Sequence, residues 1–303
     1  MKVLIVCSGN SKNRSFILDQ VAAIAQLNVE FDFFYIEGNG WIGYLKNIKS
    51  FFKKLKQFQP NLIHAHYGLS GLFSNFQRRI PVITTYHGSD IHQNKNLRLS
   101  KISILLSKQN IFVSEVLKDI AKTNKGVVIP CGVDFTIFKP IDKQLCRDFF
   151  DFKKDKKYVL FSSSFDNSIK NPSFANKIID ELGDDYVLIE LKDFSREQVA
   201  KLMSAVDIAL LTSFYEGSPQ FVKEVIACGC PIVSSDVGDV QFQLNHIRNA
   251  KIIKGFEKEE FKYAIKEFIS NHLVPNHDHV SIWDNKLIAK KIFEEYNKII
   301  FRS

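Results

Sequence analysis

The chain has 303 residues, of which 45% are hydrophobic and 24% are charged, and its formal net charge is +8. This composition is that of a globular protein of about two domains, and it excludes disordered, collagen-like and low-complexity chains. The five cysteines are scattered and lack zinc-ligand spacing, so we expect reduced, mostly buried thiols. Apolar runs are no longer than strands, so we expect a cytoplasmic protein without a signal peptide or transmembrane helix.

Short apolar runs alternate with amphipathic segments through the first part of the chain. The apolar runs predict strands over Val3–Cys7, Val29–Ile36, Leu62–His66, Val82–Tyr86, Ile111–Ser114 and Val127–Pro130. The segments between them predict helices near Phe16–Leu27, Trp41–Phe58, Leu69–Arg78 and Leu97–Ser107. This alternation is typical of a doubly wound parallel sheet.

After an irregular polar stretch that ends near Lys157, the same alternation begins again. Strands are predicted over Tyr158–Ser162, Tyr186–Leu191, Ile208–Thr212 and Pro231–Ser235. Helices are predicted near Pro172–Leu182, Ser195–Ser204 and Pro219–Cys228, and a final amphipathic helix over Asp284–Ile300. We therefore predict one domain over residues 1–139, a second over 140–283, and a C-terminal helix in 284–303.

Ligands of open parallel sheets bind at the carboxyl ends of the strands, so polar residues that follow strands are candidate site residues. After Ile208–Thr212 comes a loop with Glu216, and then Ser218 as a predicted N-cap with Pro219 at the first helical position. A helix N-terminus suits a phosphate, and the carboxylates of Glu216 and Glu224 suit sugar or ribose hydroxyls. From spacing alone, a capped helix with two solvated glutamates is an equally good interpretation.

The segment from Glu216-Gly-Ser-Pro to Glu224, followed by ACGCPIVSSDVGD, resembles the E-x7-E signature of retaining family-four glycosyltransferases. It is most similar to bacterial enzymes that assemble surface polysaccharides, such as the teichuronic-acid type. The segments NLIHAHYG from Asn61, TYHGSD from Thr85 and VIPCGVDF from Val128 match further landmarks of that family. The resemblance implies an α/β fold of the GT-B type: two Rossmann-like doubly wound domains that face a cleft, with 284–303 packing back on the N-terminal domain.

The resemblance also implies a nucleotide-sugar site in the C-terminal domain. Glu224 would hold the ribose, Glu216 would lie near the donor sugar, and Lys170 would neutralise the diphosphate. Ser164 stands where the family has a second cation, an arginine. The other residues expected at the donor site are Gly217, Ser218, Pro219, Gln220, Phe221 and, near the base, Leu191.

The first predicted strand–helix loop, residues 8–15, departs from the family pattern. The family has a pair of glycines here, whereas this chain has only Gly9. The loop also contains Lys12 and Arg14, and we hypothesise that Arg14, or Lys12, supplies the charge that Ser164 lacks.

Histidines lie at the carboxyl ends of two other predicted strands, in the N-terminal, acceptor-side domain. The resemblance implies that His87 is an active-site residue, whereas a loop histidine that caps a helix is the structural alternative. We assign His64 and His66 to opposite faces of their strand and take His66 as the better site candidate. Tyr67 and Asp90 complete the acceptor-side candidates.

The implied reaction is sugar transfer from a UDP- or GDP-sugar to a glycan or lipid-linked acceptor, with retention of configuration, in polysaccharide or lipopolysaccharide synthesis. We expect no metal or other cofactor, because the chain has no Asp-x-Asp motif. A nucleotide-sugar epimerase of the same fold and a non-catalytic nucleotide-binding subunit are the alternatives. Nucleic-acid binding would rest on net charge alone and is not expected.

The segment Trp41–Phe58 combines an apolar stripe with five lysines. A helix is required between two parallel strands at this point, so we expect its stripe to pack on the sheet. Peripheral contact with the cytoplasmic face of the inner membrane is the alternative.

Overall fold

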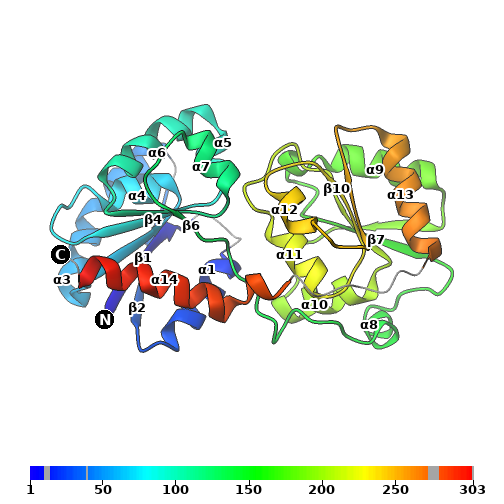
Figure 1. The fold of residues 1–303 in the computed structure, drawn as a ribbon, viewed down its shortest axis with the longest axis horizontal. Helices are drawn as coiled ribbons and strands as arrows, with labels where there is room; N and C mark the ends of the chain where they lie inside the picture. The colour runs from blue at the N-terminus through cyan, green and yellow to red at the C-terminus, as the bar shows by residue number, and fades with distance from the viewer. Residues whose placement is uncertain (10–13, 39, 272–279, 302–303) are drawn as a thin grey trace. The chain divides into compact units, whose positions relative to one another are not determined.

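The structure is a computed structural model that describes residues 1–9, 14–38, 40–271 and 280–301. The chain folds into two compact units (Figure 1). Unit 1 comprises Met1–Gly132 and Asn285–Ser303, and unit 2 comprises Val133–Asp284. The sequence-based limit at 139/140 falls later than this division, because Val133 and Phe138 are fully buried in the core of unit 2.

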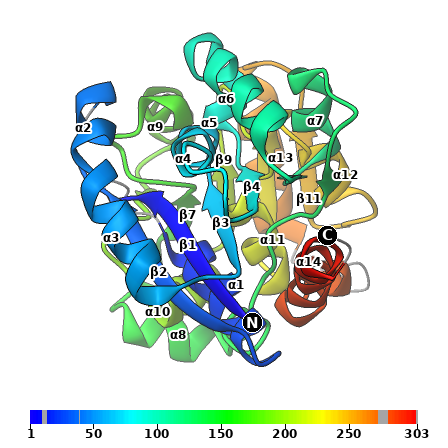
Figure 2. The same ribbon diagram turned by 90° about the vertical axis from the view of Figure 1, so that its left-hand side faces the viewer.

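Unit 1 is built on a parallel sheet. In the described residues its strand order is β2-β1-β3-β4-β5-β6, and Figure 2 shows β1 between β2 and β3. The strands are β1 (Lys2–Ser8), β2 (Glu30–Ile36), β3 (Leu62–His66), β4 (Val82–Tyr86), β5 (Gln109–Phe112) and β6 (Val127–Val128). The helices are α1 (Ser15–Ala25), α2 (Gly40–Lys46), α3 (Ile48–Phe58), α4 (Gly68–Ser74), α5 (Ser89–His92), α6 (Asn94–Leu106), α7 (Glu115–Ala121) and α14 (Asn285–Ile300).

Strand β1 shows why helices cover both faces of this sheet. Val3 and Ile5 pack with α1 and α14, whereas Leu4 and Val6 pack with α3 and α4. Successive side chains of a strand point to opposite faces, so an unbroken apolar run requires cover on both sides. Helix α14 lies beside α1 in the same unit (Figure 1), which confirms that the final helix packs back on the N-terminal domain.

The helix predicted over Trp41–Phe58 is in fact two helices that meet at Asn47. Its Nδ2 donates hydrogen bonds to the carbonyl oxygens of Glu37 at 2.8 Å and Gly43 at 2.7 Å. Phe51 and Leu55 of α3 are buried against the sheet, as expected of a crossover helix. Outward-facing apolar residues of this region stay accessible, among them Ile42, Leu45 and Phe52.

Unit 2 contains the second parallel sheet, with strand order β11-β10-β9-β7-β8 in the described residues. The strands are β7 (Lys157–Phe161), β8 (Tyr186–Ile189), β9 (Ile208–Leu211), β10 (Ile232–Ser235) and β11 (Ala250–Ile253). The helices are α8 (Lys143–Phe149), α9 (Pro172–Leu182), α10 (Arg196–Ala205), α11 (Gln220–Ala227), α12 (Val240–Leu244) and α13 (Lys258–Asn271), with 3₁₀ turns η1 (Ser168–Lys170) and η2 (Val280–Trp283).

Helices cover both faces of the second sheet as well. The buried residues of α10, α11 and α12 surround Leu160 and Leu211, and those of α9 and α13 surround Val159 and Leu210. Helix α8 lies in the stretch expected to be irregular. Its N-cap is Asp142, whose Oδ1 accepts a hydrogen bond from the Leu145 N–H at 2.9 Å.

The strand orders place one switch point in each unit. The order reverses between β1 and β3 in unit 1, and between β7 and β9 in unit 2. Ligands of doubly wound sheets bind outside the carboxyl ends of the strands at such points. The loops that follow these four strands are therefore the first places to look for a site.

Two further expectations concern the whole chain. All five cysteines are buried and free, as predicted. Among the described residues, no helix combines the length and the apolar character needed to cross a membrane.

Candidate functional site

Lys170 and Glu216 meet at the switch point of unit 2. Lys170 ends η1 in the loop after β7, and Glu216 lies in the loop between β9 and α11. Their side chains form an ion pair between Nζ and Oε1, and only 19% and 12% of the two side chains is exposed. Ser213 Oγ donates a hydrogen bond to the same Oε1 at 2.6 Å. The lysine and the glutamate predicted for the donor site are thus in contact.

The loop after β7 is held against the end of β9. Thr212 Oγ1 donates to the carbonyl oxygen of Lys170 at 2.8 Å, and the Phe214 N–H donates to that of Ile169 at 2.9 Å. Asn171 has φ 56° in the left-handed region, which asparagine tolerates better than most residues. Ser164 is half-buried in this loop, and its carbonyl accepts from the Asn167 N–H at 3.2 Å.

The start of α11 differs from the prediction by one residue. The helix begins at Gln220 and its N-cap is Pro219, which makes no side-chain capping bond. The predicted capping role of Ser218 is wrong, because its Oγ accepts instead from Nε2 of Gln243 at 3.1 Å. Gly217, Pro219 and Phe221 are buried, whereas Ser218 and Gln220 are partly accessible.

Glu224 is paired with an arginine and is not solvated. Arg196 Nη1 lies 2.8 Å from Glu224 Oε1, and the Glu224 side chain is only 6% exposed. The Arg196 guanidinium lies over the ring of Phe138, 4.4 Å from its centroid. Sequence reasoning missed Arg196. The sequence feature that could have indicated Arg196 is its position directly after Ser195, the N-cap of the helix that follows β8.

The loop after β8 contacts the loop after β7. The Leu191 N–H donates to the Ser163 carbonyl at 3.0 Å, and the Leu191 side chain packs on the core of unit 2. Glu190 Oε1 accepts from the Phe165 N–H at 2.6 Å. The residue predicted to lie near a base is therefore held by the loop that contains Ser164.

In unit 1, His64, His66 and His87 form a row of stacked rings at the ends of β3 and β4. The ring centroids of His64 and His66 lie 4.5 Å apart, and those of His66 and His87 lie 5.2 Å apart. The assignment of His64 and His66 to opposite faces is wrong, because residues two apart on a strand share a face.

His64 is a core residue. Its Nδ1 lies 2.6 Å from Tyr296 Oη and its Nε2 lies 2.7 Å from Thr85 Oγ1. Burial lowers the pKa of His64 from 6.5 to about 3, so the ring is neutral in neutral solution.

His66 is also fully buried, and it links the core to His87. Burial lowers the pKa of His66 well below 6.5, and the neighbouring His64 and His87 lower it further. His66 Nδ1 lies 3.0 Å from His87 Nε2, whereas His66 Nε2 has no hydrogen-bond partner among the described residues. Because a buried N–H needs an acceptor, we assign the proton of His66 to Nδ1. His87 then accepts at Nε2 and carries its own proton on Nδ1, 3.8 Å from Cys131 Sγ.

Tyr67 and Asp90 flank His87 in different ways. The Tyr67 ring lies 4.7 Å from the His87 ring, and Tyr67 has φ 73°, a strained backbone of the kind that clusters at functional sites. Asp90 is buried under the loop, where it accepts from the N–H groups of His87 at 3.1 Å, Gly88 at 2.8 Å and Gly68 at 3.0 Å. Burial raises its pKa, and these hydrogen bonds oppose the rise. Asp90 thus fixes the backbone of the loop that contains His87.

The loop after β1 is described only in part. The Gly9 N–H donates to the Ile36 carbonyl at 2.8 Å, which pairs the loop with the end of β2. Arg14 precedes α1, and its guanidinium lies over the Tyr35 ring, 4.6 Å from the centroid. Lys12 lies outside the described residues.

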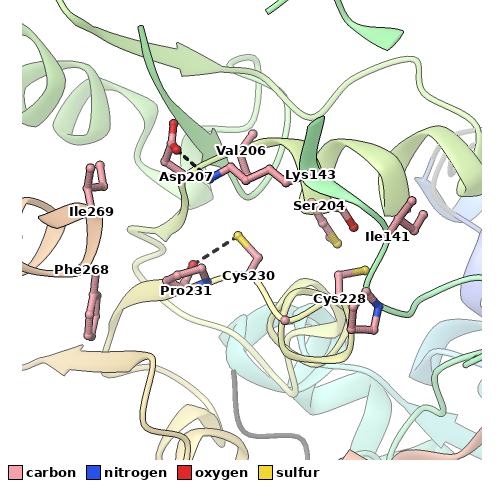
Figure 3. Close-up of a pocket in the computed structure, with 13 residues that line it drawn as sticks. Ile141, Lys143, Ser204, Val206, Asp207, Cys228, Cys230, Pro231, Phe268 and Ile269 are labelled. Carbon is pink, nitrogen blue, oxygen red and sulfur yellow. Dashed lines mark hydrogen bonds and ion pairs between the residues drawn. The ribbon is translucent and has the colours of Figure 1, made fainter. Parts of the chain in front are cut away.

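A pocket of about 310 Å³ lies in unit 2, at the end of the sheet opposite to Lys170 and Glu216 (Figure 3). Its lining includes Asp207 and Pro231, which directly precede β9 and β10, and Cys228 and Cys230 at the end of α11. Burial raises the pKa of both thiols, that of Cys230 to about 12, so they are not reactive thiolates. The pocket lies at the amino ends of the strands, away from Glu216, and we do not assign the donor to it.

Two family models match the chain, one in each part. Residues 2–136 match the model described as Glycosyltransferase Family 4, and residues 166–271 match that described as Glycosyl transferases group 1. The chain is 24% identical over 276 residues to TuaC of Bacillus subtilis (strain 168), a glycosyltransferase named for teichuronic acid biosynthesis, with 80% of this chain and 67% of that protein covered. Across the curated relatives it matches, the chain spans about half to two thirds of their length.

Solved structures share the fold over the full chain. Sucrose-phosphate synthase from Thermosynechococcus elongatus superposes with a TM-score of 0.84 at 16% identity, with 100% of both chains covered. Anabaena HepE, solved in complex with UDP-glucose, gives 0.76 at 16% identity, with 98% of this chain and 100% of that chain covered. The fold is GT-B, and the chain combines a family-four glycosyltransferase domain with a group-one glycosyltransferase domain.

Proposed function

We propose that the chain transfers a sugar, with retention of anomeric configuration, from a nucleotide sugar to a glycan or lipid-linked glycan in bacterial surface polysaccharide assembly. The observation that carries the proposal is the contact between Lys170 and Glu216 beside the start of α11. A cation, a carboxylate and a helix N-terminus at a switch point together suit a sugar diphosphate. The UDP-glucose complex of a protein with the same fold supports UDP-sugars as the first donors to test, before GDP-sugars.

In this proposal the donor diphosphate takes the place of Glu216 as the partner of Lys170. The lysine and the dipole of α11 then stabilise the negative charge that grows on the diphosphate as the sugar leaves. Glu216, released from Lys170, accepts hydrogen bonds from the donor sugar. Gly217 through Phe221 line the same position.

Glu224 is proposed to bind the ribose. Its Oε1 pairs with Arg196 Nη1 at 2.8 Å, so this oxygen is anchored. A carboxylate fixed in this way loses little conformational freedom when it accepts ribose hydroxyls.

The proposed chemical step is a front-face displacement. The acceptor oxygen bonds to the anomeric carbon on the face from which the diphosphate departs. The carbon–oxygen bond to the diphosphate breaks, and the acceptor proton passes to the leaving phosphate oxygen. Glu216 has a positioning and electrostatic role and is not a nucleophile, and the proposal involves no metal or other cofactor.

We assign donor binding to unit 2 and acceptor binding to unit 1. His87 is the proposed active-site residue of unit 1, with His66 and Tyr67 as its neighbours. Arg14 is proposed to supply the cation that Ser164 lacks. If it does, Arg14→Ala raises the donor KM strongly, and an unchanged KM contradicts this assignment.

We place the protein in the cytoplasm, with peripheral contact at the inner membrane as a secondary proposal. Exposed Leu45 and Phe52 beside the lysines of α3 support it. Cosedimentation with vesicles that contain anionic lipid tests it, and equal recovery with neutral vesicles contradicts it.

The test of the main proposal is release of nucleoside diphosphate from UDP-glucose, UDP-galactose, UDP-N-acetylglucosamine and GDP-mannose, with and without a bacterial glycolipid extract. Sugar transfer is supported if one donor releases nucleoside diphosphate only when acceptor is present. This release should be lost in Glu216→Gln and kept in the control Glu181→Gln, on the exposed face of α9. Conversion of the donor sugar without acceptor identifies an epimerase. Binding without release identifies a non-catalytic subunit. NMR of the product gives its anomeric configuration.

A further inference from the structure

Lys223, in the first turn of α11, is fully buried, with an exposed fraction of 0%. It is among the largest completely buried side chains of the protein. An ammonium group removed from water is stable only where neighbouring groups compensate its charge. Its Nζ lies 3.5 Å from Gln220 Oε1, at the start of the same helix.

A polar network connects Lys223 with the loop before α11. The positive charge of Lys223 opposes the rise in the pKa of Asp239 that burial causes, so the two side chains interact. Gln243 Nε2 donates to Asp239 Oδ1 at 2.7 Å and to Ser218 Oγ at 3.1 Å. Lys223 and Ser218 are therefore joined through Asp239 and Gln243.

The backbone before α12 lies directly against the same loop. A Cβ atom on Gly238 would be 2.9 Å from the carbonyl oxygen of Glu216 and 3.0 Å from that of Gly217. Side chains of helices lean toward the N-terminus, and the contact with Gln220 Oε1 places the Lys223 ammonium at the start of α11, next to this loop. A fully buried amino group therefore lies at the start of α11, next to the proposed diphosphate position.

This charge matters because the donor site has Ser164 where the resemblance implies a second cation beside Lys170. Ser164 is neutral, and Lys170 and Arg196 are each paired with a glutamate. We propose that Lys223 is a donor-binding residue whose buried ammonium attracts the diphosphate of the nucleotide sugar from beneath the loop. This inference rests on the proposed function and assigns one more residue to the same site.

Isothermal titration with UDP and with uridine tests the proposal. Lys223→Met should weaken UDP binding about tenfold or more. This is the effect expected when one positive charge interacts with the diphosphate across about 10 Å at an effective dielectric constant of about 20. Uridine, which has no phosphate, should bind Lys223→Met and wild type equally. Asp239→Asn removes the neighbouring negative charge but keeps an oxygen for Gln243, so it should bind UDP at least as tightly as wild type.

Lys143→Met is the matched control, because it also removes one positive charge from unit 2. Lys143 pairs with Asp207 at 2.7 Å, at the amino ends of the strands and away from the proposed donor site. The variant should leave UDP binding unchanged. Equal losses for UDP and uridine in Lys223→Met, or weaker UDP binding in Asp239→Asn, would show a purely structural network and overturn the inference. If Lys223→Met does not fold, Asp239→Asn decides alone.

The same titrations separate this inference from the proposed function. Wild type that binds none of UDP, GDP, ADP and CDP contradicts the proposed function itself. Wild type that binds UDP no more tightly than Lys223→Met contradicts only the role of Lys223.

Discussion

His64 should make unit 1 sensitive to acid. The folded ring has a pKa of about 3, whereas an unfolded histidine has about 6.5. As the pH falls below 6.5, His64 becomes protonated in the unfolded chain but stays neutral in the folded protein. The free energy of unfolding is therefore unaffected by this residue above pH 6.5, and it decreases steadily between pH 6.5 and pH 3. At about 1.4 kcal/mol per pKa unit, the loss from this residue alone reaches about 5 kcal/mol. His66, whose pKa burial also lowers, adds to the same slope.

The variant His64→Gln isolates this effect. Urea unfolding between pH 6 and pH 4, followed by hydrogen exchange of the β3 peptide, gives the free energy of unfolding of unit 1. The variant should be less stable at pH 7, yet its stability should fall less steeply with acid, by about 1.4 kcal/mol per pH unit. Tyr296→Phe is the control, because it removes the 2.6 Å partner of His64 but keeps the titrating ring. Equal slopes in His64→Gln and wild type would refute the reasoning.

Two further substitutions test the packing around the candidate sites. Gly71→Ala places a Cβ atom 2.3 Å from Ser103 Oγ and 2.4 Å from Thr84 Oγ1. Urea unfolding should therefore show that the free energy of unfolding falls by about 1–3 kcal/mol. An unchanged unfolding midpoint would contradict the close packing of α4. Asn171→Ala should lower the free energy of unfolding of unit 2 by about 1 kcal/mol, because alanine is strained at the left-handed φ of 56°. Asn171→Gly should not lower it, because glycine adopts this φ without strain. Equal melting temperatures for the two variants would argue against this backbone conformation.

Local patterns predicted the sheets well. The strands Leu62–His66 and Val82–Tyr86 and the helix Pro172–Leu182 have the predicted bounds, because each is an apolar run or an amphipathic segment with turn residues at its ends. The short elements α8 and β11 have weaker patterns and were missed. The break at Asn47 depends on a hydrogen bond to Glu37, ten residues earlier, which helical periodicity does not register.

The candidate site was predicted as a set of residues, and its electrostatics were not. Family motifs identified Lys170 and Glu216, and these two side chains are in contact. The pairing of Glu224 with Arg196 joins positions 28 residues apart, and nothing in either local pattern indicates it. No local pattern indicates that Lys223, next to Glu224, is fully buried in the folded protein.

The most direct test of the account is thermal unfolding with UDP, GDP, ADP and CMP, on wild type and on Glu224→Ala. A nucleotide at about 100 times its dissociation constant should stabilise the fold by about 2.7 kcal/mol, a shift of several degrees in Tm. We predict that one nucleotide shifts the wild type and that the variant loses this shift. No shift with any of them at millimolar concentration, or an equal shift in Glu224→Ala, would contradict a nucleotide-sugar site at Glu224.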